Sequence, residues 1–263
     1  EKPQKKQFLE IIVDAGCNVQ INKEEETIRK LISNADIVHL DWWSHPATFK
    51  FLCMCNLSKL RLLVWCHVSG LHNPLIPTKL IQISKKFIFT TECSYQADNV
   101  TNLDEKDRSK LGVVSSGVGF SEKVIPRNYD GNLPRIGFMG SINSSKLHPQ
   151  FINYLSAVSI ENFKVHMWSD DYYKDVLLEQ CNKIGKPDLI EFHGYILNPI
   201  EVLRKIDVFV YLLNPSHYGT AENVLLEAMS LGAVPIVINN PAETRIVDHK
   251  ITGFVVNNSQ EFA

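Results

Sequence analysis

Short apolar runs alternate along this chain with segments whose apolar residues recur at helical spacing. Residues 61–66 and 87–90 are runs of branched and aromatic side chains, which is typical of buried strands. Residues 7–15 and 24–34 repeat their apolar positions every three or four residues, which predicts helices. Because strands that alternate with helices favour parallel pairing, the pattern predicts an α/β fold with mainly parallel sheets.

The predicted elements fall into two series. In the first, strands are expected at 18–21, 36–40, 61–66, 87–90 and 111–114, and helices at 7–15, 24–34, 46–57, 78–83 and 94–99. In the second, strands are expected at 135–139, 163–167, 190–193, 208–212 and 234–238, and helices at 148–159, 171–184, 198–205, 221–231 and 242–248. Residues 126–134 are rich in turn-forming residues and bounded by prolines, which predicts a linker. The series therefore predict two Rossmann-like domains, residues 1–125 and 135–263.

Composition narrows the class of protein. The chain has 263 residues, 44% of them hydrophobic and 21% charged, with a net charge of −2. Near-neutral charge excludes a general nucleic-acid-binding surface, and the apolar runs are too short to span a bilayer. The six cysteines lack the paired spacing of a zinc site, which favours reduced thiols. We therefore expect a cytoplasmic protein without transmembrane segment or nucleic-acid partner, with peripheral membrane contact left open.

The most informative stretch runs from Gly219 to Val237 and predicts a tight turn, a helix, a glycine stop and a buried strand. Thr220 is the expected N-cap, and Glu222 is expected in the first turn, where its charge suits the helix dipole. Gly232 is the expected C′ residue that ends the helix. Thr220, Asn223 and Glu227 then share one polar stripe.

A carboxylate on a largely buried helix needs partners, because an unpaired buried charge is costly. The two vicinal hydroxyls of a ribose would satisfy Glu227. The free N–H groups at the helix start, beside Gly219, would form a seat for a diphosphate. The helix is therefore a candidate nucleotide site.

Residues 223–237 resemble the donor-site signature of retaining GT-B glycosyltransferases of the "glycosyl transferases group 1" (family 4-like) type. The resemblance implies a GT-B fold, with two Rossmann-like domains facing a central cleft. It implies retaining, metal-independent transfer of a sugar from a nucleoside-diphosphate sugar to an acceptor hydroxyl. That donor is the substrate, no other cofactor is implied, and a DxD motif is absent. The acceptor is expected to be a glycan or a lipid-linked or other hydroxyl compound.

The same resemblance assigns the donor site. Glu227, as the second glutamate of the family motif, would hold the ribose, but Gly219 stands where the first glutamate belongs. Glu222 is the candidate substitute in catalysis, and the alternative is a solvated acid in the first turn. The other implied donor-binding residues are Thr220, Asn223, Val224, Gly140, Ser141, His193, Gly194, Tyr195 and His217.

Lys146 and His67 are the remaining candidate catalytic residues. Lys146 matches the lysine of the family's Arg-x4-Lys pair, and Ser141 replaces the arginine. Lys146 is therefore expected to stabilise the leaving diphosphate, the alternative being an ordinary surface lysine. His67 ends an apolar strand and is expected to reach the donor sugar, or else to be a structural histidine.

Asp41, Trp42 and Trp43 follow another strand and are the candidates for acceptor binding, although hinge packing is the slightly favoured interpretation of this segment. Residues 116–120 fail as a dinucleotide fingerprint because Glu122 occupies the last glycine position.

Two other functions stay open. Loss of the family residues at Gly219 and Ser141 favours a non-catalytic GT-B-like protein or subunit that binds a nucleotide or a glycan. A nucleotide-sugar epimerase shares the architecture. The comparison with the family also predicts a chain that lacks the family's first strand and terminal helices.

Overall fold

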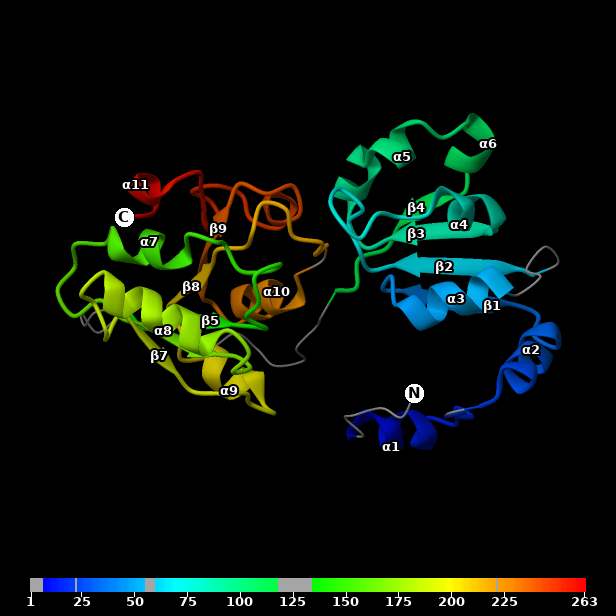
Figure 1. Ribbon diagram of the computed structural model, residues 1–263, viewed down its shortest axis with the longest axis horizontal. Coiled ribbons are helices and arrows are strands. Elements are labelled where there is room, and N and C mark those ends of the chain that lie inside the picture. The colour runs from blue at the N-terminus through cyan, green and yellow to red at the C-terminus, as the bar shows by residue number, and fades with distance from the viewer. Residues whose placement is uncertain (1–6, 22, 55–59, 118–133, 221) are drawn as a thin grey trace.

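The computed structural model describes residues 7–21, 23–54, 60–117, 134–220 and 222–263. Within these residues the chain forms two sheets, one of four strands in the order β1-β2-β3-β4 and one of six in the order β10-β9-β8-β5-β6-β7. Every strand pair in both sheets is parallel. Figure 1 shows the two sheets with their helices as separate halves of the molecule. The predicted α/β fold with parallel sheets is confirmed.

The first half contains a narrow sheet with its own core. Its strands are β1 (Val38–Trp42), β2 (Leu62–Cys66), β3 (Lys86–Phe89) and β4 (Leu111–Val113). Its helices are α1 (Gln7–Asp14), α2 (Glu25–Ser33), α3 (Pro46–Met54), α4 (Thr78–Ile83), the 3-10 helix η1 (Glu92–Gln96), α5 (Asp98–Thr101) and α6 (Glu105–Arg108). Alternate residues of β2 and β3, such as Val64 and Phe87, are fully buried because successive strand residues face opposite sides of the sheet. Helices α1 and α2 extend away from the sheet (Figure 1).

The second half is larger and its strand order reverses at its centre. Its strands are β5 (Ile136–Met139), β6 (Val165–Trp168), β7 (Ile190–Phe192), β8 (Val208–Tyr211), β9 (Val234–Ile238) and β10 (Phe254–Val256). Its helices are α7 (Phe151–Ser156), α8 (Lys174–Lys183), α9 (Pro199–Leu203), α10 (Asn223–Ser230), the 3-10 helix η2 (Glu243–Arg245) and α11 (Ser259–Phe262). The chain runs outward from β5 to β7, then returns beside β5 with β8 and runs outward the other way. Ligands of such sheets bind at this switch point, beyond the carboxyl ends of the strands.

Several predicted elements differ from the observed ones. Residues 18–21 form no strand, because β1 at the edge of the sheet pairs only with β2 among the described strands. The expected helix 94–99 is split into η1 and α5 by extended backbone at Ala97. The expected helix 242–248 is reduced to η2. The predicted linker 126–134 lies, apart from residue 134, outside the described residues.

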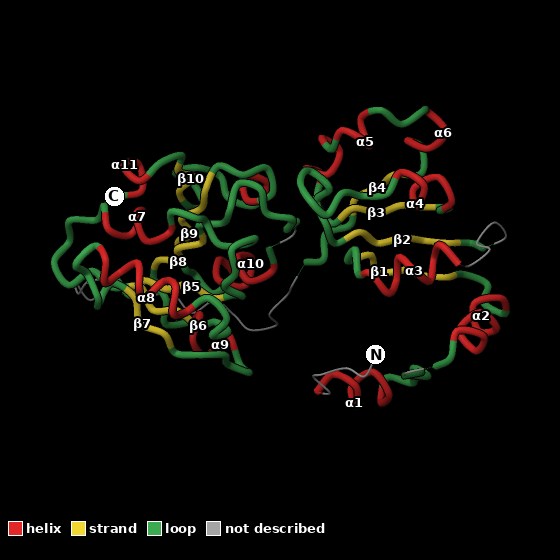
Figure 2. The backbone as a smooth tube through the Cα atoms, in the orientation of Figure 1, coloured by secondary structure: helices red, strands yellow, loops and turns green. Residues whose placement is uncertain are grey.

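The backbone of α10 lies on the side of the second half that faces the first half (Figure 2). Polar contacts join the two halves near the start of this helix. They are Ser69 N–H to the Tyr218 carbonyl at 2.9 Å, Thr90 Oγ1 to Thr220 Oγ1 at 2.6 Å, Ser116 Oγ to Asn223 Oδ1 at 3.1 Å and Arg245 Nη1 to Glu92 Oε2 at 3.3 Å. The Tyr218 side chain also packs against the core of the first half. The loop that leads into α10 is therefore shaped by both halves.

Candidate functional site

A cavity of about 380 Å³ lies between the two halves. Its lining residues follow the carboxyl ends of strands in both sheets or begin α10: Trp43, His67, Ser116, Gly140, Lys146, His217, Tyr218, Gly219, Thr220, Glu222, Asn223 and Val224. Sites for small molecules commonly have volumes of roughly 300–1,000 Å³. The cavity therefore lies where a parallel α/β sheet binds ligands and has the size of a small-molecule site.

Glu222 and Lys146 form a buried ion pair inside this cavity. The Lys146 Nζ atom lies 3.1 Å from Glu222 Oε2, with side-chain exposures of 21% and 5%. The Tyr211 hydroxyl, at the end of β8, donates a hydrogen bond to the same carboxylate oxygen. Burial alone would raise the pKa of Glu222, but Lys146, Tyr211 and His217 outweigh it and hold that pKa below the ordinary value. Glu222 is therefore an ionised, fixed carboxylate and not a solvated acid of a first helical turn.

Gly219 leaves the room that the Glu222 carboxylate occupies. A Cβ atom at position 219 would collide with Glu222 Oε1 and would lie 2.8 Å from His217 Nδ1. The φ angle of Gly219 is not in the left-handed region, so backbone freedom is not the reason for glycine here. The Glu222 carboxylate, three residues further along the chain, therefore occupies the space that a side chain at position 219 would enter.

His217 is oriented by hydrogen bonds to both of its ring nitrogens. The Gly219 N–H donates to Nδ1 at 3.0 Å, so Nδ1 is unprotonated and Nε2 carries the hydrogen. Nε2 donates to Oε2 of Glu243, a fully buried residue of η2, at 3.3 Å. His217 therefore links the buried Glu243 to the backbone of the loop that holds Glu222.

The same residues are a candidate cation cluster. Ligand atoms of His217, Glu222 and Glu243 all lie within 4.8 Å of one another. The Lys146 ammonium already pairs with Glu222, and the Gly219 N–H already occupies the Nδ1 atom of His217. A metal ion at this cluster would compete with the Lys146 ammonium for the Glu222 carboxylate.

The wall contributed by the first half is aromatic. The Trp43 indole is 60% exposed and stacks on His67, with ring centroids 4.3 Å apart and an interplanar angle of 5°. His67 Nε2 lies 2.9 Å from Asp41 Oδ1, which fixes the imidazole. Trp42 is fully buried, because β1 runs through residue 42 and turns this side chain into the core. Trp42 was expected to bind the acceptor, but its buried side chain is a core residue of the first half.

The start of α10 differs from its prediction. The helix begins at Asn223, so Thr220 is not its N-cap; Glu222 takes that place without a side-chain cap. Thr220 instead bonds to Thr90 across the two halves. Gly232 follows the helix with a φ of +84°, as predicted for a C′ residue.

Glu227 lies on α10 outside the cavity lining. Its half-buried carboxylate makes no hydrogen bond or ion pair with any residue that the structure describes. Burial raises its pKa above the ordinary value. A partly desolvated carboxylate without a protein partner is poised to accept hydrogen bonds from a ligand.

Besides Glu227, four of the predicted donor residues do not line the cavity. Ser141 is exposed beside Gly140, and residues 193–195 follow β7, two strands away from β5. Gly194 has a φ of +74°, and Tyr195 is 59% exposed. The structure therefore brings Lys146, His217, Glu222 and α10 together with His67 and Trp43, but not with these four residues.

The sequence pattern predicted neither Tyr211 nor Glu243 as a site residue. Tyr211 is the last residue of β8, and the rule that ligands gather at the carboxyl ends of strands would have singled it out. The pairing of Glu243 with His217 joins positions 26 residues apart. No local signal marks such a contact.

Comparison with known proteins assigns the second half. Residues 133–263 match the family model described as "Glycosyl transferases group 1". The second half of the chain therefore resembles the glycosyl transferases group 1 family. No curated protein matches the chain in sequence.

Solved structures share the fold of both halves of this chain. A structure of S. aureus TarM with fondaparinux, alpha-GlcNAc-glycerol and UDP has a TM-score of 0.72 at 15% identity, covering 90% of this chain and 50% of TarM. Anabaena HepE with UDP-glucose has a TM-score of 0.72 at 13% identity, covering 97% of this chain and 77% of HepE. A glycosyltransferase from Rickettsia africae has a TM-score of 0.65 at 17% identity, covering 98% of this chain and 76% of that protein.

These likenesses establish the architecture. The chain has the GT-B fold that its sequence predicts, and it spans about half the length of TarM. No helix in the described ranges is long and apolar enough to cross a bilayer.

Proposed function

We propose that this protein transfers a sugar from a nucleoside-diphosphate sugar to an acceptor hydroxyl, with retention and without a metal ion. The observation that carries the proposal is the buried Lys146–Glu222 pair in a cavity formed by both halves, beside the start of α10. The family of the second half supports sugar transfer. The UDP-glucose of HepE and the UDP of TarM support a nucleotide sugar as the donor.

The donor nucleotide would be held by the second half. The first N–H groups of α10 have no acceptor within the helix and favour an anion such as a diphosphate. Lys146 adds a positive charge beside them, which would stabilise the diphosphate as it leaves. The unpaired carboxylate of Glu227 would accept hydrogen bonds from the ribose hydroxyls. Framing of the base by His193, Gly194 and Tyr195 stays a prediction.

Glu222 would hold the hydroxyls of the donor sugar. Its carboxylate fills the space that a side chain at position 219 would enter, which supports the predicted substitution for the family's first glutamate. His67 and Trp43 face the same cavity from the other half. The exposed indole of Trp43 provides an apolar face on which an acceptor sugar could stack, and Asp41 holds the His67 ring.

The reaction would be a displacement on one face of the sugar. The bond from the anomeric carbon to the diphosphate oxygen breaks while the bond to the acceptor oxygen forms on the same side. The acceptor proton passes to the departing diphosphate oxygen. Glu222, the one carboxylate among the described lining residues, is paired with Lys146 and is not needed as a nucleophile. Lys146 supplies the positive charge that a metal ion would otherwise provide.

Calorimetry with UDP, GDP, ADP and TDP tests the donor site. One nucleotide should bind selectively, and Glu227→Ala should weaken it roughly 10- to 100-fold, the worth of hydrogen bonds to a charged group. Glu179→Ala removes an exposed acid from α8 and is the matched control. A folded chain that binds none of the four nucleotides would refute the donor site and favour a protein that binds a glycan or a partner.

Product analysis tests the chemistry. With the selected donor sugar and a panel of glycan acceptors, NMR should show a product with the anomeric configuration of the donor, and EDTA should leave the rate unchanged. An inverted product would contradict retention. Conversion of the donor sugar without an acceptor would identify an epimerase, and binding without turnover would favour the non-catalytic alternative.

A further inference from the structure

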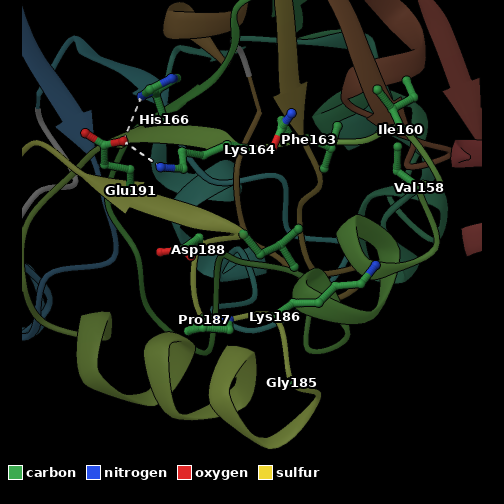
Figure 3. A pocket seen from close by; sticks show the side chains of 12 residues that line it. Val158, Ile160, Phe163, Lys164, His166, Gly185, Lys186, Pro187, Asp188 and Glu191 are labelled. Carbon is green, nitrogen blue, oxygen red and sulfur yellow. Dashed lines mark hydrogen bonds and ion pairs between the residues drawn. The ribbon is translucent and has the colours of Figure 1, made fainter.

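A cluster of polar side chains lies on one face of the paired strands β6 and β7, outside the cavity described above. Val165 and Met167 of β6 point into the core, so His166 and Trp168 face the opposite side. His166 is in register with Glu191 of β7, and His193 follows two residues later on the same face. Figure 3 shows His166 and Lys164 both directed toward Glu191. The three residues line a hollow of about 720 Å³. Strand periodicity therefore brings two imidazoles and one carboxylate together.

The three side chains point their donor atoms at one another. His166 Nδ1 lies 2.9 Å from His193 Nε2. Glu191 Oε2 lies 3.8 Å from His166 Nδ1, and Glu191 Oε1 lies 3.8 Å from His193 Nε2. Each carboxylate oxygen thus faces one of the two rings.

These separations suit a small divalent ion. Zinc binds imidazole nitrogen and carboxylate oxygen at about 2.0–2.2 Å, which places tetrahedral ligand atoms roughly 3.3 Å apart. The observed distances of 2.9, 3.8 and 3.8 Å bracket that spacing. We propose that His166, Glu191 and His193 form a surface binding site for a divalent transition-metal ion of the zinc class.

The surroundings orient the ligands and leave coordination positions open. Trp168 stacks on the His193 ring, with centroids 4.7 Å apart and an interplanar angle of 16°. The side chains of His166, His193 and Glu191 are 34%, 31% and 45% exposed, so water or a further ligand can reach an ion held between them. Two imidazoles select ions such as Zn²⁺, Co²⁺ and Ni²⁺ over Mg²⁺ and Ca²⁺, which prefer all-oxygen sites.

Lys164 is the competing cation. Its Nζ atom lies 3.3 Å from Glu191 Oε2. A metal ion must share the carboxylate with this ammonium or displace it, and an exposed pair of this kind is weak. The site lies outside the cavity between the halves, because none of its residues lines that cavity. Of its three ligands, only His193 is also among the residues predicted to frame the donor base.

The test uses the whole chain, stripped with EDTA, and two probes. Calorimetric titration with Zn²⁺ should show one equivalent bound, and Co²⁺ should give a visible absorption band typical of nitrogen and oxygen ligands. His166→Ala, His193→Ala and Glu191→Gln should each weaken binding roughly 10-fold or more. Lys164→Ala should tighten it about 2- to 5-fold, because a competing charge is removed.

Control variants separate this site from other histidines. His72→Ala removes an exposed histidine of the first half and should leave the titration unchanged. Glu243→Gln alters the buried cluster with His217 and Glu222 and should also leave it unchanged. Circular dichroism should show that all variants fold. The proposal is overturned if Zn²⁺ does not bind, if binding survives His166→Ala and His193→Ala, or if it is lost in Glu243→Gln.

Discussion

At the scale of single residues, the absence of a side chain at Gly219 determines where the Glu222 carboxylate lies. The carboxylate occupies the space beside Gly219 and is held by Lys146 and Tyr211. The sequence could offer Glu222 as a candidate but could not place it, since spacing along a chain does not say where a side chain points. Lys146 and His67 were predictable because both follow the carboxyl ends of apolar strands.

Replacing Gly219 with alanine should disturb the site more than the fold. The new methyl group collides with Glu222 Oε1, and the carboxylate can yield only by leaving Lys146 and Tyr211. We expect transfer activity to fall roughly 10- to 100-fold, the cost of losing charged hydrogen bonds. Gly117→Ala is the matched control, because among the described residues its Cβ meets only Ser115 Oγ, at 3.8 Å. Equal activity in the two variants would contradict the role given to this space.

The Glu222 carboxylate should also make stability depend on pH. Its interactions with Lys146, Tyr211 and His217 hold its folded pKa below the ordinary value of 4.5 despite burial. Its contribution is therefore complete above that value and is lost as the pH falls through the folded pKa. Thermal melts between neutral pH and pH about 3 should show a larger loss in the wild-type protein than in Glu222→Gln. If the melting temperatures of the two proteins fall in parallel with pH, the ionised form of Glu222 is not stabilised by folding.

At the scale of elements, the ends of strands and helices set what sequence analysis could foresee. Hydrophobic pattern identified most strands of both halves. It ended the first observed strand at Leu40, whereas β1 continues to Trp42 and buries that indole. It also began α10 two residues early, which made a cap of Thr220. Both errors concern the boundary of an element, the last residues of β1 and the first turn of α10, where contacts with neighbours outweigh local preference.

The centre of the larger sheet allows little added volume. A Cβ atom at Gly137 in β5 would lie 2.5 Å from Ile206 Cδ1 and 3.2 Å from Trp168 Cζ3. Gly137→Ala should therefore lower the free energy of unfolding by about 1–3 kcal/mol in urea titrations. Adding Ile206→Val, which removes the Cδ1 atom, should restore part of the loss in a double-mutant cycle. Additive effects would show that the two side chains do not compete for this space.

At the scale of the whole molecule, two separate hydrophobic cores meet through a few polar contacts. The core of the first half and the core of the second share no buried residue. The Thr90–Thr220 hydroxyl contact is buried between the halves and sits beside the cavity. We therefore expect nucleotide affinity to depend on whether the two halves stay in contact.

Substitution of either threonine tests that link. Thr90→Val or Thr220→Val leaves one buried hydroxyl without its partner, which costs about 1–3 kcal/mol. We expect weaker nucleotide binding and a larger radius of gyration in X-ray scattering for each single variant. The loss of nucleotide-binding free energy in the double variant should be smaller than the sum of the losses in the two single variants. Unchanged scattering and affinity would show that this contact does not hold the halves together.

The separate cores have a consequence for how such proteins diversify. Trp43 and His67 come from the first half, whereas Lys146, Glu222 and Glu227 come from the second. Recombination near residue 134 would exchange one set without cutting through either core. On the proposed roles, the first half determines the acceptor and the second half determines the donor, so the two specificities can be exchanged separately. A chimera that takes its first half from a related chain would keep the donor specificity of this protein and gain the acceptor specificity of the relative.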